Sequence, residues 1–396
     1  MKKRLLYHRI IPYVSHKNAL VITGMRQVGK TTLMRQIFEE IQEKPKLWFD
    51  LDNPLDQKVF EDIDYKNIFA RLVKMVEISE KERLFVFIDE IQNFPEITKV
   101  MKYLIDHFGV KFVVTGSSNF YLKNLFPESL SGRKFLYDLS PLNFREYLYF
   151  QNKIPFKEAQ ETDLEKLLRQ NNLFEFKKFE LDYEDYLKFG GFPEVVMTED
   201  AETKQQILKN IFASFFEKDL KILSDHQDIR QLRDFILLLV PRVGSMLDIT
   251  KLASELGIDR PKVYGFLEFL QGTFFIRLLP KYSKSIDRSV ASGRKVYFSD
   301  TGILNSIGQV NDAQLFENAI VNQLSAYGIV SFYNKKNAAE IDAILDGKAA
   351  FEIKLKGTEK DLGKVSKIAE SMKIRKAYVI SKIFADKKNI IAGLSL

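Results

Sequence analysis

Residues 1–150 alternate short apolar runs with stretches in which apolar residues recur at the spacing of an amphipathic helix. Short apolar runs favour buried strands, and helices between them favour crossover connections, so the pattern predicts an α/β fold with a parallel sheet. The predicted strands are Ala19–Thr23, Lys46–Leu51, Leu84–Asp89 and Phe112–Thr115.

The next part of the chain, residues 151–226, is helical in pattern. Glu158–Phe179 is rich in charged and helix-forming residues, and Tyr183–Phe189 ends at the turn-forming run Gly190–Pro193. One long amphipathic helix is predicted over Lys204–Leu223. These segments predict a helical connecting region.

Residues 227–305 carry a different order of elements. Ile249–Asp259 predicts a short helix, a glycine turn and the cap of a new helix, and Arg260–Leu270 predicts that second helix. Two strands are predicted at Phe274–Leu279 and Lys295–Phe298. A helix-turn-helix followed by a hairpin is the pattern of a winged helix.

The remainder of the chain predicts a second α/β arrangement. A helix from Leu315 precedes strands at Ile341–Leu345 and Ala350–Leu355, and a further helix precedes the strand Lys376–Ile380. The predicted regions are therefore 1–150, 151–226, 227–305 and 306–396.

The clearest chemical motif is the run Gly-Met-Arg-Gln-Val-Gly-Lys-Thr-Thr, which fits G-x-x-x-x-G-K-[ST] without a mismatch. It lies between a predicted strand and the predicted helix Leu33–Glu40. The glycines let backbone N–H groups turn toward phosphates, Lys30 reaches the β- and γ-phosphates, and the Thr31 hydroxyl holds Mg²⁺. The alternative is a plain glycine turn between a strand and a helix. The residues predicted to bind ATP or ADP are Gly24, Met25, Arg26, Gln27, Val28, Gly29, Lys30, Thr31 and Thr32.

The strand Leu84–Ile88 ends in two acidic residues, Asp89 and Glu90. An acidic pair in this position downstream of a phosphate loop is typical of a Walker B motif, in which Asp89 holds Mg²⁺ and Glu90 polarises the attacking water. Ser117–Asn119 follow the last predicted strand of this region, where ligands sit in an open α/β sheet. Ser118 is therefore a candidate to sense the γ-phosphate or position the water, with turn chemistry as the alternative.

Several further segments accompany these motifs in a fixed order: Asp89–Gln92, Thr115–Ser118, Leu130–Arg133, Leu139–Glu146, Gly190–Glu194 and Phe298–Gly302. Together they resemble the AAA-type ATPases that carry a C-terminal domain of unknown function, DUF4143. The resemblance covers most of the chain. It implies an ATP-binding AAA-like core, a winged helix and a C-terminal fold like that of restriction endonucleases.

Two arginines are candidates for contact with phosphate. Arg133 is predicted to act as an arginine finger on the γ-phosphate of a neighbouring subunit in a homo-oligomer, or to stay within its own domain. Arg26, inside the loop, is predicted to contact phosphate or an acidic partner. A surface ion pair, which contributes little, is the alternative for both.

The C-terminal region carries an acidic motif. Asp342 precedes Glu352-Ile353-Lys354 by a hairpin-sized gap, and Glu352 and Lys354 share one strand face because side chains alternate. Asp342 and Glu352 can bind Mg²⁺, Lys354 can activate water, and Glu317 on the preceding helix can complete the site. This arrangement resembles the D…E-x-K site of restriction-type nucleases. A solvated strand face, or a fold retained for binding, is the alternative.

Composition narrows the choice of function. The chain has 396 residues, is 45% hydrophobic, and contains no cysteine, which excludes disulfides, thiolate zinc sites and cysteine nucleophiles. No apolar run approaches the ~20 residues of a membrane span, so a cytoplasmic protein without a membrane anchor is expected. The net charge of +7 permits a polyanionic partner.

The leading hypothesis is an Mg²⁺-dependent ATPase whose nucleotide state changes the conformation of the appended regions. Arg260, Lys262 and Tyr264 on the second predicted winged-helix helix can contact phosphates or bases of DNA, with protein binding as the alternative. The competing functions are an ATP-regulated DNA nuclease and a slowly hydrolysing, nucleotide-gated interaction scaffold.

Overall fold

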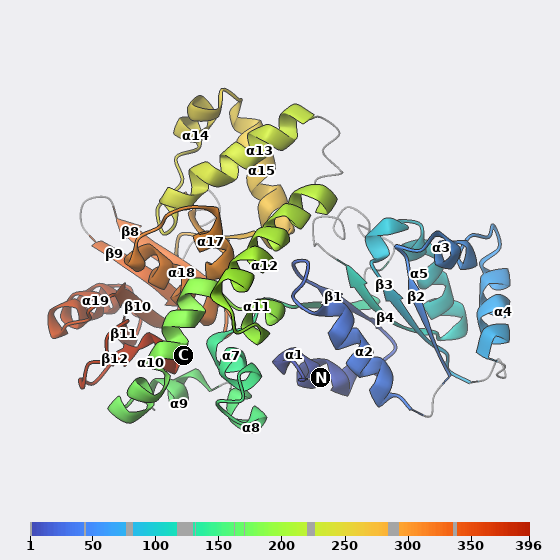
Figure 1. The fold of residues 1–396 in the computed structure, drawn as a ribbon, viewed down its shortest axis with the longest axis horizontal. Helices are drawn as coiled ribbons and strands as arrows, with labels where there is room; N and C mark the ends of the chain where they lie inside the picture. Colours follow the sequence, from blue (N-terminus) through green and yellow to red (C-terminus); the bar gives the residue numbers. More distant parts are fainter. Residues whose placement is uncertain are drawn as a thin grey trace. The chain divides into compact units, whose positions relative to one another are not determined.

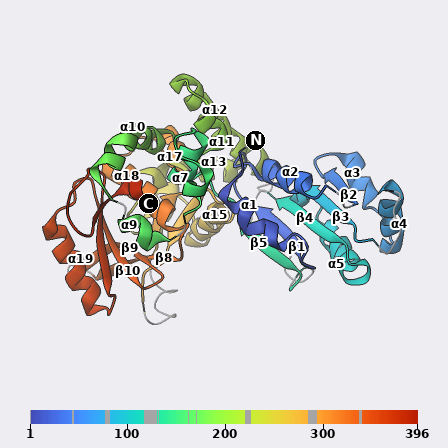
Figure 2. The ribbon, with the colours of Figure 1, turned by 90° about the horizontal axis from the view of Figure 1, so that it is seen from below.

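The computed structural model describes residues 2–42, 45–76, 82–116, 130, 132–161, 163–169, 171–219, 226–283, 293–335 and 339–396. The chain divides into two compact units (Figures 1 and 2). The first comprises Met1–Ser140 with Gly272–Phe274, and the second comprises Pro141–Gln271 with Phe275–Leu396. The division falls before the predicted boundary at 150 because Leu142 already bonds within the second unit, donating its N–H to Gly191 O (2.7 Å).

A parallel sheet forms the centre of the first unit. Its strands are β1 (Ala19–Thr23), β2 (Lys46–Asp50), β3 (Phe85–Asp89), β4 (Lys111–Gly116) and β5 (Lys134–Asp138). They lie in the order β2–β3–β4–β1–β5, and every neighbouring pair is parallel. The carboxyl ends of the strands therefore meet at one edge, which is where an open sheet of this kind places its ligands.

Helices cover both faces of this sheet, as expected for strands that are apolar throughout. One face packs against α4 (Tyr65–Val76) and α5 (Ile97–Phe108) in one apolar core. On the other face, α2 (Lys30–Glu40) places the ring of Phe38 5.0 Å from that of Phe87. The shorter helical segments of this unit are α1 (Leu5–Ile10), η1 (Ile11–Tyr13), α3 (Pro54–Val59) and η2 (Ile91–Asn93).

The second unit begins with helices, which are more divided than the sequence predicts. The charged stretch from Glu158 to Phe179 contains parts of separate helices, and Asn172 caps the last of them by accepting a hydrogen bond from Glu175 N–H (2.8 Å). The predicted helix from Lys204 is α-helical to Ser214 and then forms a π-helical turn. The elements are α7 (Phe144–Phe150), α8 (Phe156–Ala159), α9 (Leu164–Arg169), α10 (Leu173–Phe189), α11 (Pro193–Met197), α12 (Ala201–Ser214) and η3 (Phe215–Asp219).

A helix-turn-helix and a pair of strands follow in the predicted order. The helices are α13 (His226–Leu239), η5 (Val240–Arg242), α14 (Ile249–Leu256) and α15 (Arg260–Gly272). The strands β6 (Ile276–Leu279) and β7 (Lys295–Phe298) pair in antiparallel fashion. No helix in the described ranges is long and apolar enough to cross a bilayer.

The C-terminal region folds around a mixed sheet in the order β12–β11–β10–β9–β8. Figure 2 shows α19 along this sheet, where it shares an apolar core with β9, β10 and β11. Antiparallel pairing of β9 with β10 places the predicted acidic residues on adjacent strands. The elements are α17 (Thr301–Ile307), α18 (Asp312–Leu324), β8 (Val330–Lys335), β9 (Ala339–Leu345), β10 (Ala349–Lys354), α19 (Glu359–Ser371), β11 (Lys376–Ser381), β12 (Ile390–Ala392) and η6 (Gly393–Ser395).

Asp300, between β7 and α17, is a buried contact point of the second unit. Its Oδ2 accepts a hydrogen bond from Gly191 N–H (2.7 Å), and its Oδ1 accepts one from Ile303 N–H (3.0 Å). Burial raises the pKa of Asp300 to about 6, and the backbone N–H groups oppose this shift. The carboxylate thus joins the Gly190–Pro193 turn to the start of α17.

We expect Asp300→Ala to lower the stability of the second unit by about 3 kcal/mol, because it leaves buried N–H groups without an acceptor. Urea unfolding followed by circular dichroism measures the change. Asp312→Ala is the matched control, because Asp312 is exposed at the start of α18, and we expect about 0.5 kcal/mol or less for it. Equal effects of the two substitutions would contradict the role given to Asp300.

Candidate functional site

The loop between β1 and α2 has the backbone of a phosphate-binding loop. Gly24, Gln27 and Gly29 have φ values of 149°, 63° and 94°, so the chain curls between the strand and the helix. Gly24 lies so close to Leu139 that a Cβ built on it would be 2.1 Å from Leu139 O. Only glycine fits there, because any side chain would collide with backbone.

Lys30 lies inside the loop and is 5% exposed. Its ammonium group donates to Gly24 O (3.0 Å) and Met25 O (2.8 Å). The cation is therefore held at the concave side of the loop, where the phosphates of a nucleotide are bound in proteins of this type.

Three side chains from α2, β3 and β4 meet beside the loop. Thr115 donates a hydrogen bond to the carboxylate of Asp89, which is 5% exposed, and the Thr31 hydroxyl lies near the same carboxylate. Burial raises the pKa of Asp89, and the two hydroxyl groups oppose the rise. The carboxylates of Glu90 and Asp50 lie near enough to raise it further. The hydroxyl and carboxylate oxygens are the hard ligands that Mg²⁺ prefers.

Glu90 follows directly and has an unusual backbone. Its φ is 54°, in the left-handed region, and its N–H donates to Thr115 Oγ1 (3.2 Å). Its carboxylate accepts a hydrogen bond from the amide of Gln92. A non-glycine residue in this region stores strain of about 1 kcal/mol or more, which is a frequent property of functional positions.

Three residues of this site were not predicted from the sequence. Thr115, the last residue but one of β4, links Asp89 to the backbone of Glu90, and Asp50 ends β2 directly beside Asp89 in the sheet register. Arg4, buried before α1, donates to Val28 O and Ser140 O, each at 2.7 Å. Polar residues at the carboxyl ends of two strands were a usable signal for Thr115 and Asp50, whereas Arg4 had no local signal.

ATP and Mg²⁺ fit these residues. The curled loop with Lys30 supplies N–H groups and a cation for the phosphates, and Thr31 with Asp89 supplies oxygens for the metal. When bound with ATP, Mg²⁺ neutralises charge on the phosphates. Glu90 directly follows Asp89 in the chain and can orient a water molecule there.

Other residues predicted for this site lie elsewhere or outside the described residues. Arg133 precedes β5 at the amino end of the sheet, about 13 Å from the loop at ~3.3 Å per residue, and its Nε is 2.6 Å from Asp106 Oδ1. The phosphate-binding loop of its own domain is thus at the opposite end of the sheet, and contact with a neighbouring subunit stays a prediction. Arg26 is half-buried within the loop. Ser118 lies outside the described residues.

The acidic residues predicted near the C-terminus do come together. Lys354 Nζ lies 2.9 Å from Glu352 Oε1 and 3.9 Å from Asp342 Oδ2. Two residues missed by sequence analysis, Lys295 and Glu340, join them. We name this set the acid–lysine cluster; its members are Glu317, Glu340, Asp342, Glu352, Lys295 and Lys354.

Charge and burial shift the protonation of this cluster. Burial and the charge of Asp342 raise the pKa of Glu317 to about 7, and the same two causes raise the pKa of Glu352. In the described parts of the chain, no group of three or more His, Cys, Asp or Glu side chains is placed to hold a metal ion. The nuclease-type Mg²⁺ site stays a prediction: Lys354 contacts Glu352 and Asp342 as the motif places it, and Lys295 adds a second cation beside Glu340 and Glu317.

The predicted DNA-contacting residues of α15 differ in their surroundings. Arg260 and Tyr264 are exposed, and Tyr264 keeps 52% of its accessible area. Lys262 instead bonds to Asp228 of α13. Two of the three residues therefore present their side chains to solvent.

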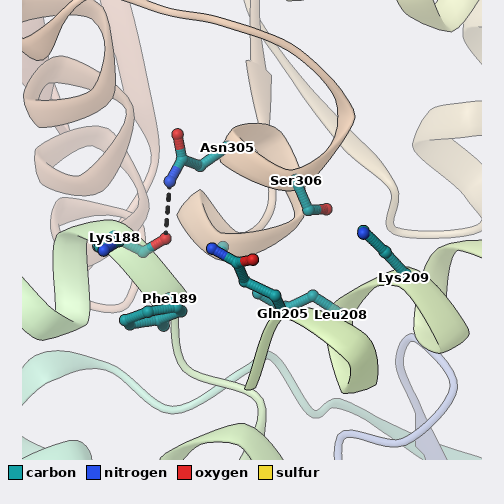
Figure 3. Close-up of a pocket in the computed structure, with 8 residues that line it drawn as sticks. Lys188, Phe189, Gln205, Leu208, Lys209, Asn305 and Ser306 are labelled. Carbon is teal, nitrogen blue, oxygen red and sulfur yellow. Dashed lines mark hydrogen bonds between the residues drawn. The ribbon is translucent and has the colours of Figure 1, made fainter. Parts of the chain in front are cut away.

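A pocket of about 180 Å³ lies in the second unit, between α10, α12 and α17 (Figure 3). Asn305 at its edge donates to Lys188 O (3.1 Å). Small-molecule sites usually measure ~300–1,000 Å³, so this pocket is too small to be assigned a ligand. Its lining residues are Lys188, Phe189, Gln205, Leu208, Lys209, Gly302, Asn305 and Ser306.

Comparison with known proteins supports part of this assignment. A family model described as AAA domain matches residues 16–148, and one described as domain of unknown function DUF8612 matches residues 180–314. The first segment is therefore a P-loop domain of the AAA type. The second match carries a different domain description from the DUF4143 that the motifs resemble.

Relatives and solved structures of similar sequence or fold are as follows. An uncharacterized protein of Methanocaldococcus jannaschii is 27% identical over 89% of this chain and 79% of its own length. An uncharacterized protein of Haemophilus influenzae is 27% identical over 82% of this chain and 78% of its own length. A Walker-type ATPase of Pyrococcus abyssi aligns over 76% of this chain and 94% of its own, with 14% identity and a TM-score of 0.46.

We expect Thr115→Val to slow ATP turnover about tenfold while leaving ATP affinity unchanged. The substitution removes one hydrogen bond to Asp89 and one from Glu90, and a loss of about 1.4 kcal/mol corresponds to that factor. Steady-state phosphate release and calorimetric ATP titration measure the two effects. Thr98→Val, which alters a buried threonine on α5, is the control. Normal turnover in Thr115→Val would contradict the positioning role.

Proposed function

We propose that the protein is an Mg²⁺-dependent ATPase whose nucleotide state changes the conformation of the second unit. The observation that carries the proposal is the meeting of Lys30, Thr31 and Asp89 at the carboxyl edge of the sheet. In this assignment Lys30 binds the β- and γ-phosphates, and Thr31 and Asp89 hold Mg²⁺. Glu90 orients the attacking water. A nucleotide-gated scaffold would share the binding residues and differ in turnover.

The loop is connected to the segment that leads out of its unit. Leu139 N–H donates to Thr23 O (2.7 Å), and Leu139 O contacts Gly24. Arg4 bonds Val28 O in the loop and Ser140 O, the last residue before the second unit. A rearrangement of the loop on nucleotide binding is therefore transmitted to Leu139 and Ser140.

After Ser140 the chain is hydrogen-bonded to the Gly190–Pro193 turn, which in turn bonds to Asp300. Leu142 donates to Gly191 O (2.7 Å), and Gly191 N–H donates in turn to Asp300 (2.7 Å). Asp300 follows the β7 segment that carries Lys295, with Ser299 between them. The nucleotide loop is therefore connected to the second unit through the chain at Ser140 and Pro141, and these hydrogen bonds lie at both ends of that connection, which supports the proposed coupling.

Two substitutions separate binding from hydrolysis. Lys30→Ala removes a charge-assisted contact of about 2–3 kcal/mol, so we expect ATP affinity in calorimetry to fall about a hundredfold. Glu90→Gln keeps the size of the side chain and loses its charge, so we expect normal ATP affinity and turnover at least about a hundredfold lower.

Matched controls are available in the same unit. Lys99→Ala and Glu96→Gln alter exposed residues on or beside α5, and both should bind and hydrolyse ATP normally. An unchanged ATP affinity in Lys30→Ala would contradict the assignment of the ATP site. Negligible wild-type turnover with intact ATP binding would favour the scaffold.

DNA is the partner that the second unit supports best. The helices α13–α15 with β6 and β7 have the order expected of a winged helix, and Arg260 and Tyr264 are exposed on α15. An arginine and an aromatic ring on one exposed helix suit phosphate contact and base stacking. DNA binding is proposed without cleavage, because Lys295 adds to the acid–lysine cluster a second cation besides the Lys354 of the motif.

We expect double-stranded DNA to bind with an affinity that falls as salt rises, and Arg260→Ala to weaken it and to reduce the salt slope by about one. Fluorescence anisotropy over a salt series measures both. Lys251→Ala on α14, an exposed lysine, is the control. A DNA affinity that does not change with salt concentration would contradict this interface, and so would wild-type affinity in Arg260→Ala.

A further inference from the structure

Lys295 is a buried lysine whose ammonium group lies inside the acid–lysine cluster. It is 3% exposed, and its Nζ lies 2.9 Å from Glu340 Oε1 and 3.9 Å from Glu317 Oε1. The ring centre of Phe332 lies 5.4 Å from the same nitrogen. Groups from α18, β8 and β9 therefore enclose the cation, and a lysine this deeply buried is rare unless it is paired.

Glu317 is held in place from the side of β7. Tyr297 OH donates to Glu317 Oε1 (2.7 Å). Gly244, whose φ is +76°, leaves room for the carboxylate, since a Cβ at that position would lie 2.9 Å from Glu317 Oε1. Gly244 N–H is itself bonded to Val296 O (3.0 Å) on β7. β7 and its neighbouring segment thus fix the position of this carboxylate.

Lys354 pairs with the other half of the cluster. Its Nζ contacts Glu352 and Asp342, and Asp342 Oδ2 also accepts a hydrogen bond from Ile353 N–H (2.8 Å). Each carboxylate of the cluster therefore lies within 4.0 Å of an ammonium nitrogen. A divalent cation needs carboxylate oxygens at about 2.0–2.6 Å, and it would meet like charge from both lysines.

We propose that Lys295 is the resident cation of the acid–lysine cluster. Its ammonium group supplies positive charge among the carboxylates, as a divalent metal does in a restriction-type nuclease site. The cluster thereby holds β7 against the C-terminal sheet without a metal. This inference does not depend on the ATPase proposal, because no residue of the phosphate loop takes part.

The protonation of the cluster agrees with this role. With the pKa of Glu317 at about 7, that carboxyl is partly protonated at neutral pH. Burial opposes ionisation of Glu340, but the hydrogen bond and charge of Lys295 outweigh it and lower the pKa of Glu340. The two lysines therefore offset part of the negative charge of the four carboxyl groups.

The hairpin is also joined to the C-terminal sheet by its backbone. Beyond β6, Tyr282 N–H donates to Phe332 O (2.6 Å), and Phe332 N–H donates to Pro280 O (3.1 Å). β6 thus continues onto the edge strand β8, while Lys295 ties β7 to α18 and β9. The β6–β7 hairpin, which follows the helix-turn-helix, is therefore attached to the C-terminal sheet through both of its strands.

The test is a Mn²⁺ titration of the full chain by calorimetry in the absence of nucleotide. For the wild type we expect the same titration as for Asp342→Asn, since the cluster holds no metal. Lys295→Met leaves four carboxyl groups beside a single lysine, so we expect it to bind Mn²⁺ at least about tenfold more tightly than the wild type, because the added net negative charge favours the metal. The double variant Lys295→Met/Asp342→Asn should lose that gain.

Controls keep the outcome decisive. Lys348→Met alters an exposed lysine in the β9–β10 turn and should gain no metal site, and Lys295→Arg keeps the charge and should not either. Wild-type Mn²⁺ binding that Asp342→Asn abolishes, or Mn²⁺-dependent DNA cleavage that Asp342→Ala abolishes, would overturn the proposal without any need for Lys295→Met to fold. A folded Lys295→Met variant with wild-type metal affinity would overturn it as well.

Discussion

The close approach of Gly24 to the carbonyl of Leu139 is the contact on which the rest of the structure depends. A side chain at residue 24 would occupy the position of that carbonyl. The absence of one lets the loop curl around Lys30 and lets the segment 139–140 lie against it, where Arg4 bonds both. The same packing therefore shapes the loop for phosphate and attaches it to the residues that enter the second unit.

The second unit is organised by buried polar groups near β7. Asp300 follows this strand and accepts backbone N–H groups, while Lys295 on the strand itself lies among carboxylates. Buried charges cost free energy unless they are paired, so such contacts specify geometry more than they add stability. The position of β7 between the helix-turn-helix and the C-terminal sheet is specified in this way.

The predictability of the strands followed their burial only in part, since the edge strand β2 is half-buried and was still predicted. β1, β3 and β4 are buried along their whole length, so their apolar runs were predicted to within a residue or two. β5 was missed although Phe135, Leu136 and Tyr137 form a short apolar run; it lies at the edge of the sheet with half-exposed residues. The charged stretch from Glu158 was predicted as helical in pattern but without helix boundaries, since charge and helix propensity do not encode where a cap such as Asn172 interrupts the chain.

The sequence alone determined the loop, the acidic pair Asp89–Glu90 and the shared face of Glu352 and Lys354, because these features depend on adjacent residues or on strand alternation. Only the tertiary structure decided which distant groups meet them. Parallel strand direction brought Thr115 to Asp89 and took Arg133 to the opposite end of the sheet. The packing of β7 brought Lys295 into the acid–lysine cluster. Such contacts join residues far apart in the chain, and no local pattern records the direction or packing that creates them.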